Sequence, residues 1–99
     1  MNPAMVELLG ILDGAARMSL LDLTTTAAPQ PRNARGHIDF RTRAARQWFE
    51  RWDALMGAAL DMIDAGLAEV LIPADGCNPD EIGITDAGRD YLAEMRALS

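Results

Sequence analysis

The segment from Gly66 to Leu92 constrains the fold of this chain more than any other part of the sequence. It contains, in order, a glycine suited to ending a helix, an alternating apolar run, a loop rich in turn residues, a second short apolar run and a threonine suited to beginning a helix. Alternation bounded by glycine and proline is typical of short strands. We therefore predict a β-hairpin over about residues 67–84 and a C-terminal helix over about residues 85–97.

A long helix is predicted immediately before this hairpin, over about residues 41–65. Apolar side chains keep a single helical phase through the whole stretch, whereas a helix-turn-helix corner would reset that phase. Asp53 could still cap a second helix, so two shorter helices remain the alternative. The apolar arc contains Ala44, Ala45, Trp48, Phe49, Trp52, Leu55, Met56, Ala59, Leu60, Met62 and Ile63, and the opposite arc contains Arg43, Arg46, Glu50, Asp53, Gly57, Asp61 and Asp64.

The first third of the chain is less regular. Pro3 and the helical spacing of the apolar residues that follow it predict a helix over residues 3–17. The capping-box spacing of Ser19 and Asp22 favours a second short helix, but the run Leu23–Thr26 favours extended structure, and the sequence does not decide between them. Residues 27–37 are rich in proline and arginine, which predicts a flexible loop.

The length of 99 residues is enough for one hydrophobic core, so we expect a single domain over residues 1–99, mainly α with a small β-hairpin. Apolar residues make up 49% of the chain, which excludes a disordered protein. No apolar run approaches the roughly 18 residues of a membrane helix, and the first basic residue is Arg17, so we expect a cytoplasmic protein without a signal peptide. The expected core is Leu9, Leu12, Trp48, Trp52, Leu55, Leu60, Ile63, Val70, Ile84 and Leu92.

The formal net charge is −6, but the charge is unevenly distributed. Between residues 32 and 51 there are six arginines and two acids, a local charge of +4, whereas the rest of the chain has three arginines and thirteen acids, a charge of −10. Such a chain can self-associate, bind a charged partner or simply solvate two differently charged faces.

The reactive residues are too few to suggest catalysis, since the chain has one histidine, one cysteine, one tyrosine, two serines and no lysine. His37 has no second ligand at metal-binding spacing, and the acids around Cys77 do not follow the spacing of an EF-hand loop. We therefore expect no enzyme activity, no cofactor and no metal site. Trp48, Phe49 and Trp52 are expected in the core; the alternative is a partly exposed anchor for a partner.

From about residue 53 to residue 98 the sequence resembles the wing half of winged-helix (winged helix-turn-helix) domains, as in bacterial regulators related to the multiple-antibiotic-resistance repressor. The positions that carry the resemblance are Leu60, Ile63, Gly66, Leu67, Ile84, Thr85, Gly88 and Leu92. The resemblance implies a winged-helix-like fold whose hairpin is the wing, and a homodimer paired through the first and last helices.

In that family the helix before the wing enters the major groove of DNA, and the wing contacts phosphate. In this chain the corresponding positions carry acids, which would repel phosphate. They are Glu50, Asp53, Asp61 and Asp64 on the helix and Asp75, Asp80 and Glu81 in the wing. The sequence therefore indicates an acidic variant that lacks the usual chemistry for DNA docking.

Two functions remain open. We favour a protein-protein interaction domain, whose acid row also permits a DNA-mimic interpretation, such as a phage-type inhibitor whose carboxylates stand in for phosphates. The alternative is a DNA-binding transcriptional regulator that uses the basic segment Arg32–Arg51. The candidate partner-binding residues are Arg32, Arg35, Arg41, Arg43, Arg46, Glu50, Asp53, Asp61 and Asp64.

Overall fold

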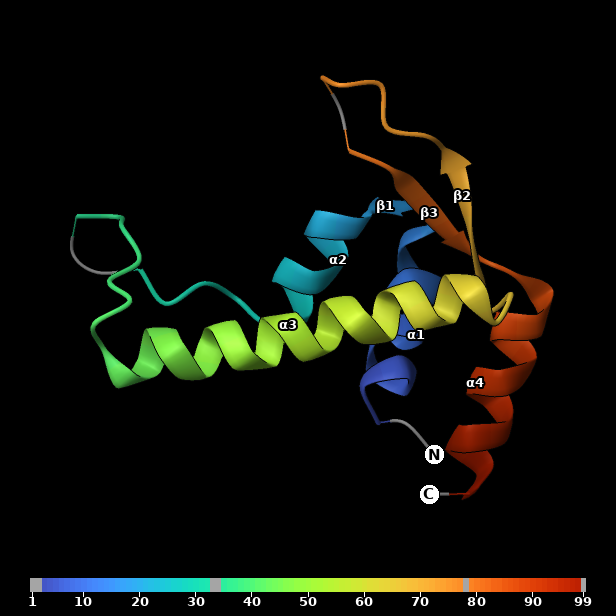
Figure 1. The fold of residues 1–99 in the computed structure, drawn as a ribbon. Helices are drawn as coiled ribbons and strands as arrows, with labels where there is room; N and C mark the ends of the chain where they lie inside the picture. The colour runs from blue at the N-terminus through green and yellow to red at the C-terminus, as the bar shows by residue number, and fades with distance from the viewer. Residues whose placement is uncertain (1–2, 33–34, 78, 99) are drawn as a thin grey trace.

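A computed structural model describes residues 3–32, 35–77 and 79–98, and positions 33 and 34 of the predicted loop lie outside this part. The chain is mainly helical with a small three-stranded antiparallel sheet (Figure 1), which confirms the predicted fold class. The elements in chain order are α1 (Pro3–Ala15), β1 (Met18–Ser19), α2 (Leu20–Ala27), α3 (Arg43–Asp64), β2 (Ala68–Ile72), β3 (Glu81–Ile84) and α4 (Asp86–Leu98). None of the helices in these described ranges combines the length and apolar composition that crossing a membrane requires.

Helix α3 is a single helix, so the two-helix alternative is wrong. It begins after Thr42, whose side chain accepts a hydrogen bond from the Ala45 N–H at 3.2 Å. It ends at Asp64, and Gly66, two residues further on, has a φ of 76° that allows the Leu67 N–H to reach back to the Met62 carbonyl at 2.9 Å. Asp53 lies exposed within the helix and caps nothing.

The segment after Ser19 is helical rather than extended. The Ser19 side chain accepts from the Asp22 N–H at 3.0 Å, as its capping-box spacing suggested. The Thr24 hydroxyl donates to the carbonyls of Leu20 and Leu21, and this bonding within the helix accommodates the threonine run. Helix α1 ends at Ala15, two residues earlier than predicted, because Ala16 adopts a left-handed φ of 64°.

The sheet has the strand order β1-β3-β2, with both pairs antiparallel. The sequence predicted only the β2–β3 hairpin; Met18 pairs with Ile82 and adds a two-residue strand to its other side. Strand β3 is central, and its residues Ile82, Gly83 and Ile84 are buried. Strand β2 is an edge strand, and four of its five residues are exposed.

The core lies between α1, α2, α3 and the base of the hairpin, with α4 closing one end against α1. Of the expected core, Leu60 and Val70 are wrong, because 50% of Leu60 and 43% of Val70 remain exposed. Leu60 lies at the margin of the apolar arc of α3, and Val70 belongs to the edge strand. Trp48, Trp52 and Ile63 are half-buried, while Leu9, Leu12, Leu55, Ile84 and Leu92 are buried as predicted.

A short joint holds the end of α3 to the start of α4. The Thr85 hydroxyl donates to the Gly66 carbonyl at 2.7 Å and accepts from the Gly88 N–H at 3.0 Å. The Thr85 N–H donates to the Leu67 carbonyl at 3.1 Å. Thr85 therefore caps α4 and at the same time fixes it to the two residues Gly66 and Leu67 between α3 and β2.

Candidate functional site

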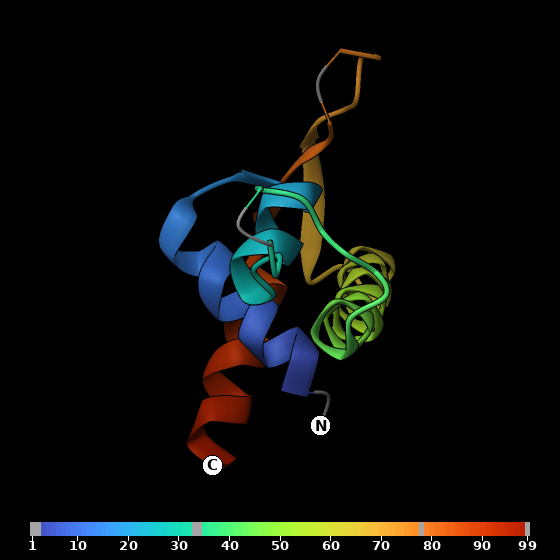
Figure 2. The ribbon, with the colours of Figure 1, turned by 90° about the vertical axis from the view of Figure 1, so that its left-hand side faces the viewer.

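Helix α3 forms one outer side of the molecule. Figure 2 views it end-on, at the edge of the ribbon, with α1, α2 and α4 all on its inner side. Its inner face packs on α1 and α2, and the core cluster contains its buried side chains Leu55, Ala59 and Met62. The amphipathic pattern of the sequence thus fixes which side of the helix turns outward.

The opposite side of the helix, which we call the α3 face, lies within an arc of about 120° at 3.6 residues per turn. Every residue on it is exposed. The α3 face consists of Arg43, Arg46, Gln47, Glu50, Asp53, Ala54, Gly57, Asp61 and Asp64. The structure therefore brings six of the nine candidate partner-binding residues onto one surface.

Charge changes sign along the α3 face. Arg43 and Arg46 lie in its first turn, whereas Asp61 and Asp64 lie in its last turn, about 31 Å from the first charge to the last at 1.5 Å per residue. This order opposes the helix dipole, whose positive N-terminal end favours acids and whose negative C-terminal end favours bases. Within the described part of the chain, no salt bridge joins any charged side chain of the α3 face to another residue.

The opposed dipole makes a testable prediction at Asp64. Replacing Asp64 by asparagine is expected to stabilise the protein by about 0.3–1 kcal/mol at low ionic strength, because it removes a negative charge from a helix C-terminus. Asp86→Asn should have the opposite sign, since Asp86 lies in the first turn of α4 and pairs with Arg89 at 3.3 Å. Urea denaturation at two salt concentrations measures both effects, and a loss of stability in Asp64→Asn would contradict the dipole argument.

Arg51 and Arg32 of the basic segment bond to residues outside the α3 face. Arg51 donates to Glu7 of α1 at 2.9 Å and to the Ala27 carbonyl at 3.3 Å, so it ties α3 to α1 and to the end of α2. Arg32 donates to the Gly36 carbonyl at 2.6 Å and to Gln30. Arg32 and Arg35 belong to the connection between α2 and α3, so the structure does not place them on the α3 face.

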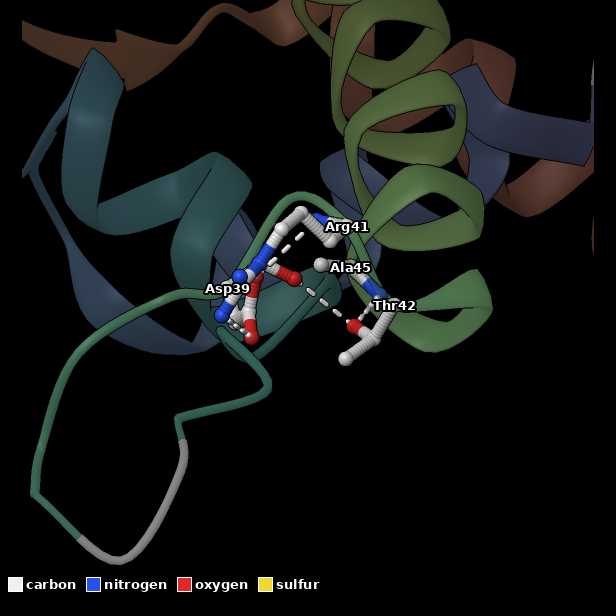
Figure 3. A network of polar contacts seen from close by, with 4 residues as sticks. All are labelled: Asp39, Arg41, Thr42 and Ala45. Atoms are coloured by element: carbon white, nitrogen blue, oxygen red, sulfur yellow. Dashed lines mark hydrogen bonds and ion pairs between the residues drawn. The ribbon is translucent and has the colours of Figure 1, made fainter.

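Arg41 takes part in the network that precedes α3 (Figure 3). Its guanidinium donates to the Asp39 carboxylate at 3.0 and 3.1 Å, and its backbone N–H donates to the same carboxylate. These hydrogen bonds hold the pKa of Asp39 below its ordinary value, and the carboxylate in turn raises the pKa of Arg41. Thr42 completes the network by donating to the Asp39 carbonyl at 2.8 Å while it caps the helix.

An aromatic cluster lies beside the first half of α3. Phe40, Trp48, Phe49 and Trp52 have neighbouring ring centroids 6.1 to 6.4 Å apart. Phe40 and Phe49 are about half-exposed, at 54% and 48%, whereas the Trp48 indole N–H donates to the Ala28 carbonyl at 2.8 Å. The cluster is thus half-buried on its tryptophan side and exposed on its phenylalanine side, so the expectation that Phe49 lies in the core is wrong. Sequence reasoning missed Phe40, because it precedes the helix and so falls outside the periodic pattern.

A second exposed apolar surface, which the sequence did not predict, lies on the edge strand. Val70, Leu71 and Ile72 are each at least 39% exposed. Ile72 also lines a shallow hollow of about 580 Å³, together with Ser19 and Leu21 from the start of α2. The alternating pattern of residues 67–73 predicts the strand, but the four residues of β2 after Ala68 are all exposed.

The described residues include no group of three histidine, cysteine or acidic side chains arranged to hold a metal ion. Cys77 and His37 are both exposed. Comparison of the chain with protein-family models, with curated proteins and with solved structures finds no match, so the family of this chain is open and the geometry of its surfaces carries the functional argument.

Proposed function

We propose that this chain is a non-enzymatic, cytoplasmic, winged-helix-like domain for protein-protein interaction, which binds a protein partner through its α3 face. The order of helices and strands and the sheet order β1-β3-β2 support the winged-helix interpretation. The long connection over residues 28–42 departs from a helix-turn-helix, whose helices are joined by a turn of about three or four residues. We therefore do not propose that α3 is a recognition helix joined to α2 by a short turn.

The observation that carries the proposal is the set of exposed charges on the α3 face, none of which forms a salt bridge with another residue that the structure describes. Their order opposes the helix dipole, so helix stability does not account for it. Four acids and two arginines on one surface favour a protein partner, whose own charges can be of both signs, over DNA, whose phosphates the acids would repel. A DNA-mimic mode would use only the acidic two thirds of this surface and would leave Arg43 and Arg46 without a role.

Affinity purification from a nuclease-treated lysate of the source organism tests this proposal. A double variant, Asp61→Arg with Asp64→Arg, should lose a stoichiometric protein that the original chain captures. A matched variant, Asp90→Arg with Glu94→Arg, makes the same charge change at exposed acids of α4 and should retain that protein. Equal capture by both variants, with both folded by circular dichroism, would exclude the α3 face as the binding surface.

A DNA-binding regulator is the second candidate, favoured by Arg43 and Arg46. Both are exposed at the start of α3, and Arg32 and Thr42 line a shallow hollow of about 220 Å³ that also includes Ala44 of this helix. In this case, replacing Arg43 and Arg46 by alanine should weaken binding to all DNA sequences alike and reduce the dependence of affinity on salt. Fluorescence anisotropy with labelled duplexes measures both quantities. Unchanged DNA affinity in the double variant would eliminate this function.

A further inference from the structure

We propose that the partner that fits the α3 face is a second copy of this chain, with the two α3 helices packed antiparallel across a two-fold axis. This inference rests on the proposed function, since it names the occupant of the same surface. It follows from the positions of the charges along the helix, from the helix dipole and from two half-exposed apolar side chains on one flank.

The charges of the α3 face are symmetric about a single point. Arg43 and Asp64 are equally far from the midpoint between Asp53 and Ala54, and so are Arg46 and Asp61. When two identical helices are placed antiparallel about that midpoint, Arg43 of one copy lies opposite Asp64 of the other. Arg46 lies opposite Asp61 in the same way. Because a two-fold interface repeats each contact, the arrangement forms four ion pairs.

The same arrangement reverses the unfavourable dipole interactions. In an antiparallel pair, the arginines at the N-terminus of one helix lie beside the C-terminus of the other, where cations are favoured. The acids at each C-terminus likewise lie beside the partner's N-terminus. The charge order that opposes the dipole of a single α3 therefore suits the dipole of an antiparallel second copy.

Phe49 and Leu60 provide an apolar contact on one flank of the α3 face. Both side chains are about half-exposed, at 48% and 50%. Their midpoint lies one residue, about 1.5 Å, from the midpoint of the charges. A two-fold axis perpendicular to both helices keeps each side chain on the same flank, so Phe49 lies beside Leu60 of the second copy. At the centre, Ala54 and Gly57 present little side chain, which allows the helices to approach closely.

Other occupants of the α3 face fit less well. A parallel pair would place arginines against arginines and acids against acids, which is repulsive. A uniformly basic protein would leave Arg43 and Arg46 facing like charge. The antiparallel pair brings Asp53 close to its own copy near the axis, and it leaves Glu50 opposite Gly57 with no arginine to pair with. This repulsion and the modest area of a single helix face indicate a weak, reversible dimer rather than an obligate one.

Analytical ultracentrifugation from about 5 to about 500 µM at low salt tests the dimer, because this range covers weak homodimers. The original chain should self-associate reversibly. A variant with Arg43→Asp and Arg46→Asp, and another with Asp61→Arg and Asp64→Arg, should each associate at least about tenfold more weakly, since every ion pair becomes a like-charge contact. The two variants mixed in equal amounts should form a heterodimer, because each then presents the charges that the other lacks.

If mixing the two variants restores association, the weak association of each variant alone comes from the changed interface and not from a defect in folding. Asp53→Asn should strengthen self-association, and the control Asp90→Arg with Glu94→Arg should leave it unchanged. A monomeric original chain over the whole range would overturn the dimer, as would folded variants that fail to form a heterodimer. Neither result decides the proposed function, which the affinity purification tests separately. If the Asp61→Arg and Asp64→Arg variant fails to capture a foreign protein that the α4 control does capture, the proposed function stands even without the dimer. Equal capture by both variants would reject the proposed function instead.

Discussion

Replacing Gly88 by alanine is expected to destabilise the protein by about 3 kcal/mol, which corresponds to a fall in melting temperature of about 12–24 °C for a domain of this size. The added Cβ would lie 2.0 Å from the carbonyl oxygen of Leu67 and 2.8 Å from Cγ1 of Ile84. The Leu67 carbonyl cannot move aside easily, because it accepts the Thr85 N–H at 3.1 Å within the joint between α3 and α4. Helix α4 would have to move away, and urea and thermal denaturation measure the loss.

Gly57→Ala is the matched control, since it makes the same chemical change in another helix. Gly57 is exposed in the middle of α3, and a Cβ built there meets nothing within 4 Å. Alanine is favoured over glycine in a helix, so this variant should be more stable by about 0.5–1 kcal/mol. Both variants are best measured at low micromolar concentration, where self-association contributes little. A neutral Gly88→Ala would mean that α4 does not approach Leu67 as closely as the structure has it.

The long helix and the hairpin could be predicted from the sequence because their signals are local. Helical periodicity placed the ends of α3 within two residues, and the glycine and proline that bound residues 67–73 placed β2 within one. The same periodicity placed six candidate residues on one arc, and the structure puts all six on the α3 face. A pattern carried by neighbouring residues survives folding, since tertiary contacts have only to choose which face turns inward.

Features that depend on residues far apart in the chain could not be predicted from the sequence. Strand β1 has only two residues and exists because Met18 meets Ile82. The sequence places Arg51 in the basic segment, but the structure pairs it with Glu7, 44 positions earlier in the chain. The exposure of Val70 depends on the position of β2 at the edge of the sheet, which no local pattern encodes. The sequence could therefore predict which residues share a helix face, but it could not predict which charged residues form ion pairs with distant parts of the chain.

Truncating Leu55 to alanine is expected to cost about 3 kcal/mol, whereas the same change at Leu60 should cost less than about 1 kcal/mol. Leu55 is 1% exposed and belongs to the core cluster, so its removal leaves a cavity among buried side chains. Leu60 is 50% exposed and leaves no enclosed space. Both residues lie inside α3 and both changes are leucine to alanine, so helix propensity cancels and the difference measures burial. Urea denaturation of the two variants side by side gives this difference directly.

The comparison also fixes the rotation of α3 about its own axis. Leu55 and Leu60 are five positions apart, which separates them by about 140° around the helix at 3.6 residues per turn. Equal losses would require the helix to turn so that both side chains are buried, which would turn one edge of the α3 face inward. The charges that are symmetric about the midpoint between Asp53 and Ala54 would then no longer all lie on a surface that a second copy could reach. The α3 face is exposed as described only if Leu55→Ala loses much more stability than Leu60→Ala. This difference can be measured without knowing any partner.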